Sequence, residues 1–170
     1  MVKSGDVLNK VSHKLGVPLE LLIFTNKLDG SGLRIGQKLY WMPGPFTVEV
    51  ERKAAKVVVY RKGEFFAQAP ITSVQGHAVV GPLKKGKYTV TPVKVHDKPA
   101  YKDGQRISTT DRGYASAFHW VVMSPSGHTI FAEPGAGATA QRPSTGYGVD
   151  PEFVRQLSVL LPKDDTVTIR

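Results

Sequence analysis

The sequence contains no cysteine among its 170 residues. This absence excludes disulfide bonds, thiolate metal sites and catalysis by a thiol. It does not fix the compartment, because proteins of oxidising and of reducing compartments can both lack cysteine. Any chemistry performed by these residues must therefore use other side chains.

Four further features are missing. No stretch reaches the roughly 18 consecutive apolar residues of a membrane-spanning helix. Met1 is followed at once by Val-Lys-Ser-Gly-Asp rather than by the apolar core of a secretion signal. No basic run with interleaved aromatics indicates a nucleic-acid surface. The 5 histidines lack metal-ligand spacing. We therefore expect no membrane span, no nucleic-acid partner, no metal site and no cofactor.

The composition favours a turn-rich β protein with a basic surface. Apolar residues make up 41% of the chain, enough for a core, and 17 glycines and 12 prolines suit short turns between strands. The net charge of +9 attracts polyanions, an acidic cell wall among them, although a solvated basic surface gives the same value. A chain of this length can hold a small domain followed by a medium one.

The N-terminal segment has the pattern of a small strand-helix-helix-strand unit. Apolar residues over 7–15 recur at helical spacing, and Gly16 is placed to end that helix. Pro18 is placed to open a second helix that ends at Asn26. Alternating apolar residues over 33–39 predict a closing strand.

This segment, residues 1–44, resembles a LysM domain. The resemblance lies in residues 2–8, in the second helix and in residues 33–39 followed by Pro43; Val7 stands where the family usually has Thr. LysM domains bind N-acetylglucosamine-containing glycans, chiefly peptidoglycan and chitin, between two loops. By position, the resemblance implies a glycan-binding set of Gly5, Asp6, Val7, Leu8, Leu28, Asp29, Gly30 and Ser31. The alternative is that the leucines belong to the core and the glycines serve only turns.

Residues 45–170 predict a mainly β domain with one late helix. Strands are expected over 46–50, 57–60, 65–69, 71–80, 120–123, 129–131 and 166–169. Asp150 is placed as the N-cap of a helix over 151–160 whose buried side is Phe153, Val154 and Leu157. The predicted fold class is α+β, with the small unit followed by a β sandwich or barrel-like sheet.

This second segment resembles the L,D-transpeptidase catalytic domain, the YkuD fold. Residues 56–68 look like the opening hairpin, residues 153–169 like the closing helix and strand, and Trp120 stands where a Trp is common. Residues 81–90 are similar to the family's Thr-Pro-x-Gly-x-Phe segment, with Gly81 in place of Thr and two residues inserted. Enzymes of this family use a His-Gly pair and a Ser-x-Gly-Cys segment ending in Arg, in which the Cys attacks a peptide carbonyl and the His acts as base.

The residues at these positions lack the family's chemistry. The positions are occupied, in chain order, by Phe131, Ala132, Ser144, Gly146, Tyr147 and Val149. Phe131 falls at the His and Tyr147 at the Cys, while an ungapped count back from the late helix puts Gly146 at the Cys instead. Loss of the nucleophile, the base and the Arg together predicts a domain without transpeptidase activity.

The sequence thus favours a non-enzymatic, peptidoglycan-binding protein of the bacterial cell envelope. Its expected partners are peptidoglycan or a chitin-like glycan, with stem peptides held in the cleft where the family's enzymes bind substrate. An envelope location assumes an export signal outside this sequence. Two alternatives stay open. One is an active transpeptidase or peptidase with Ser144 or Tyr147 as replacement nucleophile, near His128, Asp150 and Glu133 in sequence. The other is an envelope scaffold that binds no glycan.

Overall fold

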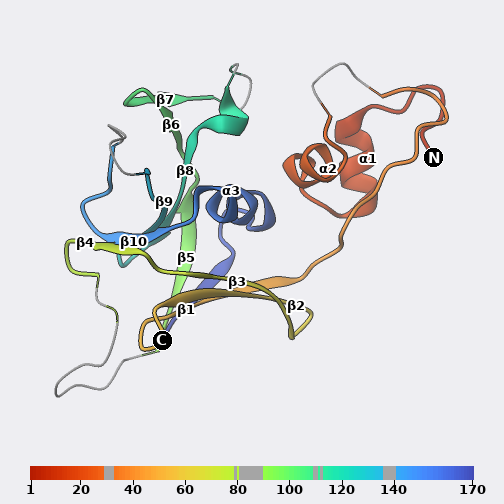
Figure 1. Cartoon of the computed structure of the whole chain (residues 1–170). Helices are drawn as coiled ribbons and strands as arrows, with labels where there is room; N and C mark the ends of the chain where they lie inside the picture. The colour runs from red at the N-terminus through yellow and green to blue at the C-terminus, as the bar shows by residue number, and fades with distance from the viewer. Residues whose placement is uncertain (29–32, 79, 81–89, 109–110, 112, 136–140) are drawn as a thin grey trace. The chain divides into compact units, whose positions relative to one another are not determined.

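The computed structural model describes residues 1–170 except 29–32, 79, 81–89, 109–110, 112 and 136–140 (Figure 1). Over the described residues, the chain divides into two compact units, Met1–Pro45 and Phe46–Arg170. The first unit contains helices, whereas the second is built on a large sheet with one late helix.

Two helices form the first unit, as the sequence predicts. They are α1 (Leu8–Leu15) and α2 (Leu19–Thr25). Gly16 ends α1 in the left-handed conformation, with φ of 64°, and its N–H donates to the His13 carbonyl. Pro18 directly precedes α2 and Asn26 follows its last turn. Leu21 and Leu22 of α2 are buried, so the apolar stripe of this helix supplies the core of a small unit.

The segments that flank these helices are extended but do not form regular strands over the described residues. Val2 donates its N–H to the Gln37 carbonyl at 2.9 Å and accepts the Gly36 N–H at 2.8 Å. A turn follows immediately, in which Gly5 has a φ of 82°. The predicted pair of strands is therefore shortened to one bridge around Val2, because the chain turns away before a ladder can extend.

The second unit contains eleven strands in its described part. They are β1 (Phe46–Glu51), β2 (Lys56–Arg61), β3 (Glu64–Pro70), β4 (Ser73–Gln75), β5 (Thr91–Asp97), β6 (Ala100–Lys102), β7 (Gln105–Ile107), β8 (Phe118–Ser124), β9 (Thr129–Ala132), β10 (Gly146–Val149) and β11 (Thr166–Ile169). A 3-10 turn, η1 (Tyr114–Ser116), precedes β8, and α3 (Pro151–Leu160) lies between β10 and β11.

One curled sheet connects most of these strands. Its order is β3-β2-β1-β11-β5-β8-β9-β10-β4, and β6 pairs with both β7 and β8. The pairs β1–β11 and β9–β10 are parallel, and the other pairs are antiparallel. The two end strands, β3 and β4, are separated only by Ile71 and Thr72, which donate their N–H groups to Ala55 and Gly148 respectively. The sheet therefore curls until one chain segment forms both of its ends, with β1–β3 in one layer and β4, β9 and β10 in the other (Figure 1).

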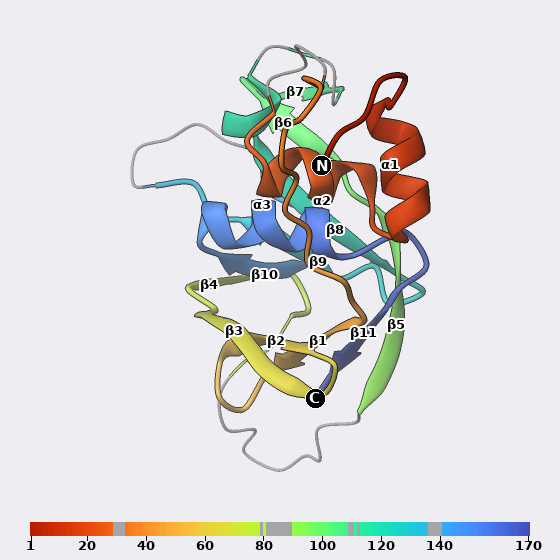
Figure 2. The same cartoon turned by 90° about the vertical axis from the view of Figure 1, so that its right-hand side faces the viewer.

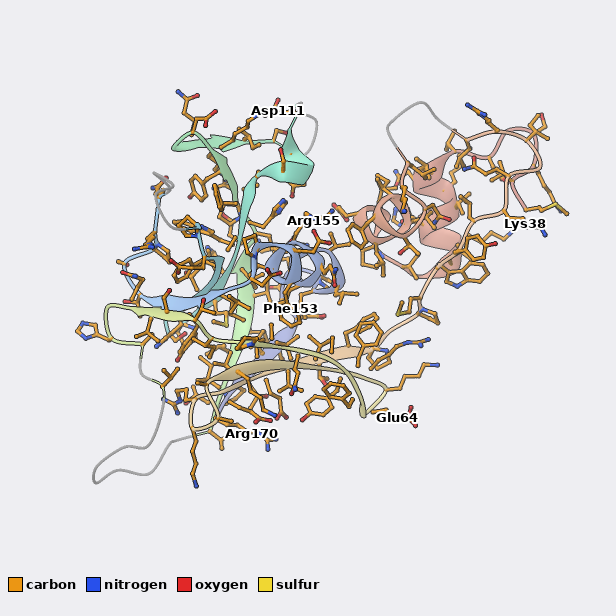
Figure 3. All side chains as sticks on the ribbon, in the orientation of Figure 1. Lys38, Glu64, Asp111, Phe153, Arg155 and Arg170 are labelled. Atoms are coloured by element: carbon orange, nitrogen blue, oxygen red, sulfur yellow. The ribbon has the colours of Figure 1, made fainter. Side chains whose placement is uncertain are left out.

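Helix α3 covers β8 and β9 (Figure 2). As the sequence predicts, Asp150 caps it: the carboxylate accepts the Phe153 N–H at 2.9 Å. Its buried side consists of Val154, Leu157 and Ser158. Phe153 was expected on that side but is only half-buried, because it lies in the first turn, where the helix face begins (Figure 3).

The α+β prediction, with a mainly β second unit and one late helix, is confirmed. The expected region over 71–80 contributes the short β4, whereas Val79 and 81–89 lie outside the described residues. The sequence did not predict the β6–β7 hairpin, because its exposed polar residues carry no alternating apolar signal.

Candidate functional site

The predicted glycan-binding set begins in a tight turn. The Lys3 N–H donates to the Asp6 carboxylate at 2.7 Å, and the Asp6 N–H donates back to the Lys3 carbonyl at 3.1 Å. Gly5, at φ of 82°, is exposed within this turn. A residue with a side chain is strained in that conformation, so the turn requires glycine. Backbone groups in such a short exposed loop are available to hydrogen-bond a ligand.

Val7 follows the turn as the N-cap of α1. Its side chain is 51% exposed and supplies no capping hydrogen bond. The hydroxyl of a Thr at this position would be able to accept an N–H from the first turn of α1. The departure from the family's pattern noted in the sequence therefore has a local consequence, a helix start without a side-chain cap.

The remaining predicted glycan-binding residues are described only in part. Leu8 and Leu28 are both half-buried, and the Leu28 N–H donates to the Ile23 carbonyl at 3.0 Å. Asp29, Gly30 and Ser31 lie outside the described residues. The two leucines are thus partly available to a ligand and partly packed.

Asn26, which sequence analysis used only as the end of α2, ties the unit together. Its amide nitrogen donates to the Leu22 carbonyl at 2.8 Å and to the Tyr40 carbonyl at 2.6 Å, and its amide oxygen accepts the Tyr40 N–H at 2.7 Å. A side chain therefore takes the place of a strand partner for Tyr40. The orientation of the amide follows from these three bonds.

In the second unit, five of the six residues that the sequence resemblance places at the family's motif lie on the parallel strands β9 and β10, and Ser144 precedes β10. Tyr147 is in register with Ile130, and Gly148 is in register with Phe131. Side chains alternate between the two faces of a sheet, and residues in register share a face. The Tyr147 side chain therefore points to one face and Phe131 to the other.

Phe131 instead lies over the two glycines that flank Tyr147. A Cβ atom built on Gly146 would be 3.3 Å from Phe131 Cδ1, and one built on Gly148 would be 3.0 Å from Phe131 Cζ. The Cβ at Gly146 would also collide with the Thr129 carbonyl oxygen, and the one at Gly148 with the Ser73 hydroxyl and the Glu133 carboxylate. Only glycine fits this backbone at Gly146, so a side chain there requires β9 to move.

Tyr147 is fully buried, and its ring stacks on His128, which precedes β9. The ring centroids are 5.6 Å apart at an interplanar angle of 13°. The Nδ1 atom of His128 is buried and, within the described part of the chain, accepts or donates no hydrogen bond. Burial lowers the pKa of His128 below its ordinary value, so this imidazole is neutral at pH 7.

The other residues considered as a replacement catalytic group do not assemble around this histidine. Ser144 is exposed, and the Asp150 carboxylate caps α3. No hydrogen bond links either of them to His128 over the described residues. A nucleophile, a base and an orienting acid in mutual contact, as a catalytic triad needs, are not formed by these three residues.

Glu133, also named from the sequence, belongs to a different cluster. One carboxylate oxygen accepts a hydrogen bond from the Ser73 hydroxyl. The other accepts one from Arg142, with 2.5 Å between Nη2 and the oxygen. Ser73 on β4 and Arg142 before β10 were not predicted from the sequence, since nothing in their spacing signals the contact. Both oxygens of the Glu133 carboxylate are thus held by other side chains, so the cluster is a fixed polar contact.

His119 on β8 lies on the side of the sheet that packs against α3. Its Nε2 is 2.9 Å from the Tyr114 carbonyl, and Ser158 of α3 lies near its Nδ1 at 3.5 Å. Burial lowers the pKa of His119, and the positive charge of Arg155 on α3 acts in the same direction (Figure 3). The bond to Tyr114 and the charge of Glu152 oppose this shift. His119 is thus a neutral structural contact between the sheet and the helix.

Residues 1–41 match the family model of the LysM domain, which confirms the resemblance seen in the N-terminal sequence. No curated relative matches the chain. Among the described residues, no helix combines the length and apolar character needed to cross a membrane.

Solved structures similar to this chain include three L,D-transpeptidases. One from Enterococcus faecium is 13% identical, with 81% of this chain and 54% of that chain covered and a TM-score of 0.45. One from Mycobacterium smegmatis is 11% identical, with 81% and 64% covered and a TM-score of 0.47. One from Stackebrandtia nassauensis is 14% identical, with 96% and 75% covered and a TM-score of 0.44. The chain thus spans less than two thirds of the first two structures.

Proposed function

We propose that this chain is a non-catalytic, peptidoglycan-binding protein of the bacterial cell envelope. The observation that carries the proposal is the LysM match over residues 1–41 in a sequence without any cysteine. The first unit binds N-acetylglucosamine-containing glycan, peptidoglycan or a chitin-like polymer, through the turn at Gly5 and Asp6 and the loop after α2. The domain boundary lies near residue 44, and residues 45–170 form a transpeptidase-like domain without turnover.

The geometry of β9 and β10 supports the absence of transpeptidation. The family's reaction needs a nucleophile and a base in contact. Tyr147 is buried and points away from Phe131, while Gly146 and Gly148 offer no side chain. With Tyr147 or with Gly146 at the Cys position, the motif therefore lacks a nucleophile and a base in contact.

The charge of the chain suits an envelope location. A net charge of +9 attracts an acidic cell wall over the range of the screened field. The second unit retains a polar cluster of Ser73, Glu133 and Arg142 beside the former motif. Stem peptides, which carry charged termini, are the ligand class that this domain would hold without turnover.

The experiment that tests this function is co-sedimentation of the protein with peptidoglycan sacculi, competed by soluble chitooligosaccharide. We expect sedimentation that the oligosaccharide displaces. Asp6→Ala, which removes the carboxylate that closes the turn, should weaken sedimentation. Asp111→Ala removes a carboxylate that accepts an equivalent N–H, from Ser108 at 2.6 Å in the second unit, and should not. A wild-type protein that stays in the supernatant at low salt would refute glycan binding and favour the scaffold alternative.

A second candidate function follows from the exposure of Ser144. This hydroxyl reaches solvent at the start of the motif, whereas Tyr147 does not. A hydrolase or transferase that uses Ser144 would release or exchange peptide from muropeptides, and Ser144→Ala would abolish that turnover. Intact protein mass measured after incubation with muropeptides detects an acyl adduct on this serine.

A further inference from the structure

Two consecutive aromatic side chains are exposed at the end of the first unit. Tyr40 is 68% exposed and Trp41 is 48% exposed. Tyr and Trp carry large apolar faces that proteins usually bury, and both are enriched where a ligand or partner covers them. These rings follow directly on the closing segment of the unit, which Lys38 marks in Figure 3.

The backbone beneath Tyr40 is held on both sides by one side chain. The Asn26 amide accepts the Tyr40 N–H at 2.7 Å and donates to its carbonyl at 2.6 Å. Because both bonds use backbone atoms, the direction of the Tyr40 Cα–Cβ bond is fixed while the ring remains free to meet a ligand. A pre-positioned ring loses little conformational entropy on binding.

Tyr40 also lies next to the start of a predicted glycan-binding loop. Asn26 is separated from Leu28 by a single residue, and the Leu28 N–H is bonded to Ile23 in the last part of α2. The contact with Asn26 therefore places Tyr40 at the end of α2 from which that loop departs. A ligand that contacts Leu28 would therefore lie at the same end of the helix as this ring.

We propose that Tyr40 forms a stacking subsite for a pyranose ring of the bound glycan. This inference rests on the proposed glycan-binding function and adds a contact that the LysM resemblance does not assign. The C–H face of a pyranose packs against the electron-rich face of an aromatic ring, and its hydroxyl groups need polar neighbours. Two exposed lysines are close to Tyr40 along the chain or through a hydrogen bond. Lys38 precedes Tyr40 by two residues, and Lys27 directly follows Asn26, whose amide is bonded to the Tyr40 backbone. A ring bordered by such groups suits a sugar better than a broad apolar partner.

Successive residues of an extended segment point to opposite sides, so the two rings present separate faces. Tyr40, the more exposed ring with the fixed backbone, is the stacking residue. Trp41 is then a reporter of the segment, because its half-exposed indole responds to a change in the backbone that it shares with Tyr40. The other tryptophan, Trp120, is 7% exposed and lies in the second unit.

The test measures affinity for chitooligosaccharide by calorimetry in the full chain. Tyr40→Ala should weaken binding roughly two- to tenfold, the range expected for losing one aromatic contact. Tyr40→Phe keeps the ring and should bind as the wild type does. Tyr40→Leu keeps apolar bulk without the ring and should bind as weakly as Tyr40→Ala. Ile35→Ala, at a side chain that is 74% exposed in the same unit, should leave affinity unchanged.

The substitutions at residue 40 leave the Asn26 bonds intact, since those bonds use only the backbone, and Trp41 emission in the free protein checks the local fold. Wild-type affinity in Tyr40→Ala would overturn the stacking subsite while leaving the glycan-binding function in place. A wild-type chain that binds no chitooligosaccharide and no sacculi would overturn both. A shift of Trp41 emission on binding, retained in Tyr40→Phe, would support the proposal.

Discussion

Phe131 and Tyr147 lie on neighbouring parallel strands and point to opposite faces of the sheet. One ring covers Gly146 and Gly148, and the other stacks on His128. This arrangement separates the two residues that the sequence resemblance places at the family's His and Cys positions. It also explains the alternation of glycine and tyrosine in β10, because only glycine fits beneath the ring of Phe131.

A thiol introduced at Tyr147 should be inaccessible in the folded protein. The side chain is fully buried, so the thiol of Tyr147→Cys should react with an alkylating reagent only after unfolding. The same variant loses a buried ring, and its unfolding free energy should fall by about 3 kcal/mol. Ser144→Cys is the matched control, since its exposed thiol should react in the native protein. Rapid native labelling of Tyr147→Cys would contradict the buried orientation.

Gly146→Ala should destabilise the second unit. Its Cβ would collide with the Thr129 carbonyl, so β9 and β10 must separate, at a cost of about 2 kcal/mol for overpacking. Urea unfolding followed by Trp120 fluorescence measures the change. Gly135→Ala is the control, because an added Cβ there has open space and no strained φ. Equal stability of the two variants would count against the close approach of β9 and β10.

Val7→Thr should stabilise the first unit. The new hydroxyl can accept an N–H from the first turn of α1, which has no side-chain cap, and such a cap contributes about 1 kcal/mol. Thermal unfolding followed by circular dichroism detects the gain. Val90→Thr makes the same change at an exposed position outside any helix and should be neutral. A Val7→Thr chain that unfolds no later than wild type would show that α1 does not use this cap.

Asn26→Ala should loosen the end of the first unit. It removes three hydrogen bonds to Leu22 and Tyr40, at a cost of about 1–3 kcal/mol where backbone groups lose their partners. Hydrogen exchange at the Tyr40 amide should accelerate. Asn9→Ala, on the exposed side of α1, provides the comparison. An unchanged exchange rate would mean that Asn26 does not hold this segment.

Stability of the second unit should fall as the pH drops below about 6.5, the ordinary pKa of histidine. Burial lowers the pKa of His119 and of His128 in the folded state. In the pH range between the lowered folded pKa and the unfolded value, the unfolded chain binds more protons. The contribution of these histidines to the free energy of unfolding is therefore complete above their pKa in the unfolded chain. It is lost as the pH falls from that value through their lower pKa in the folded protein.

The measurement is urea unfolding at pH 7.5 and pH 5.5 in wild type, His119→Gln and His13→Gln. His119→Gln should show a smaller difference between the two pH values, because one proton-linked group is gone. His13 is exposed on α1 and its replacement should leave the difference unchanged. A pH dependence that survives in His119→Gln and in His128→Gln would exclude these histidines as its source.

Much of the fold could be predicted because its strongest signals are local. Gly16 and Pro18 mark the ends of helices, Asp150 caps α3, and alternating valines form β1. Three consecutive buried valines form β2, where both faces are covered. These features depend on a few neighbouring residues, which a sequence displays directly.

The contacts around the motif depend on strand register, which the sequence does not display. Nothing in the spacing of Ser73, Glu133 and Arg142 indicates that they meet, because the sheet order brings β4 beside β10. The opposite orientations of Phe131 and Tyr147 likewise follow from a pairing that a one-residue shift would reverse. The two hydrogen bonds between the Asn26 amide and the Tyr40 backbone join residues 14 positions apart in the sequence. They take the place of the strand partner that the sequence predicted for this segment.

The segment from β3 to β4 forms both ends of the curled sheet. Its removal would therefore uncover β2 and β10 at the same time. Two unpaired strand edges on one molecule can recruit two neighbours, and growth in both directions leads to polymers rather than to closed dimers.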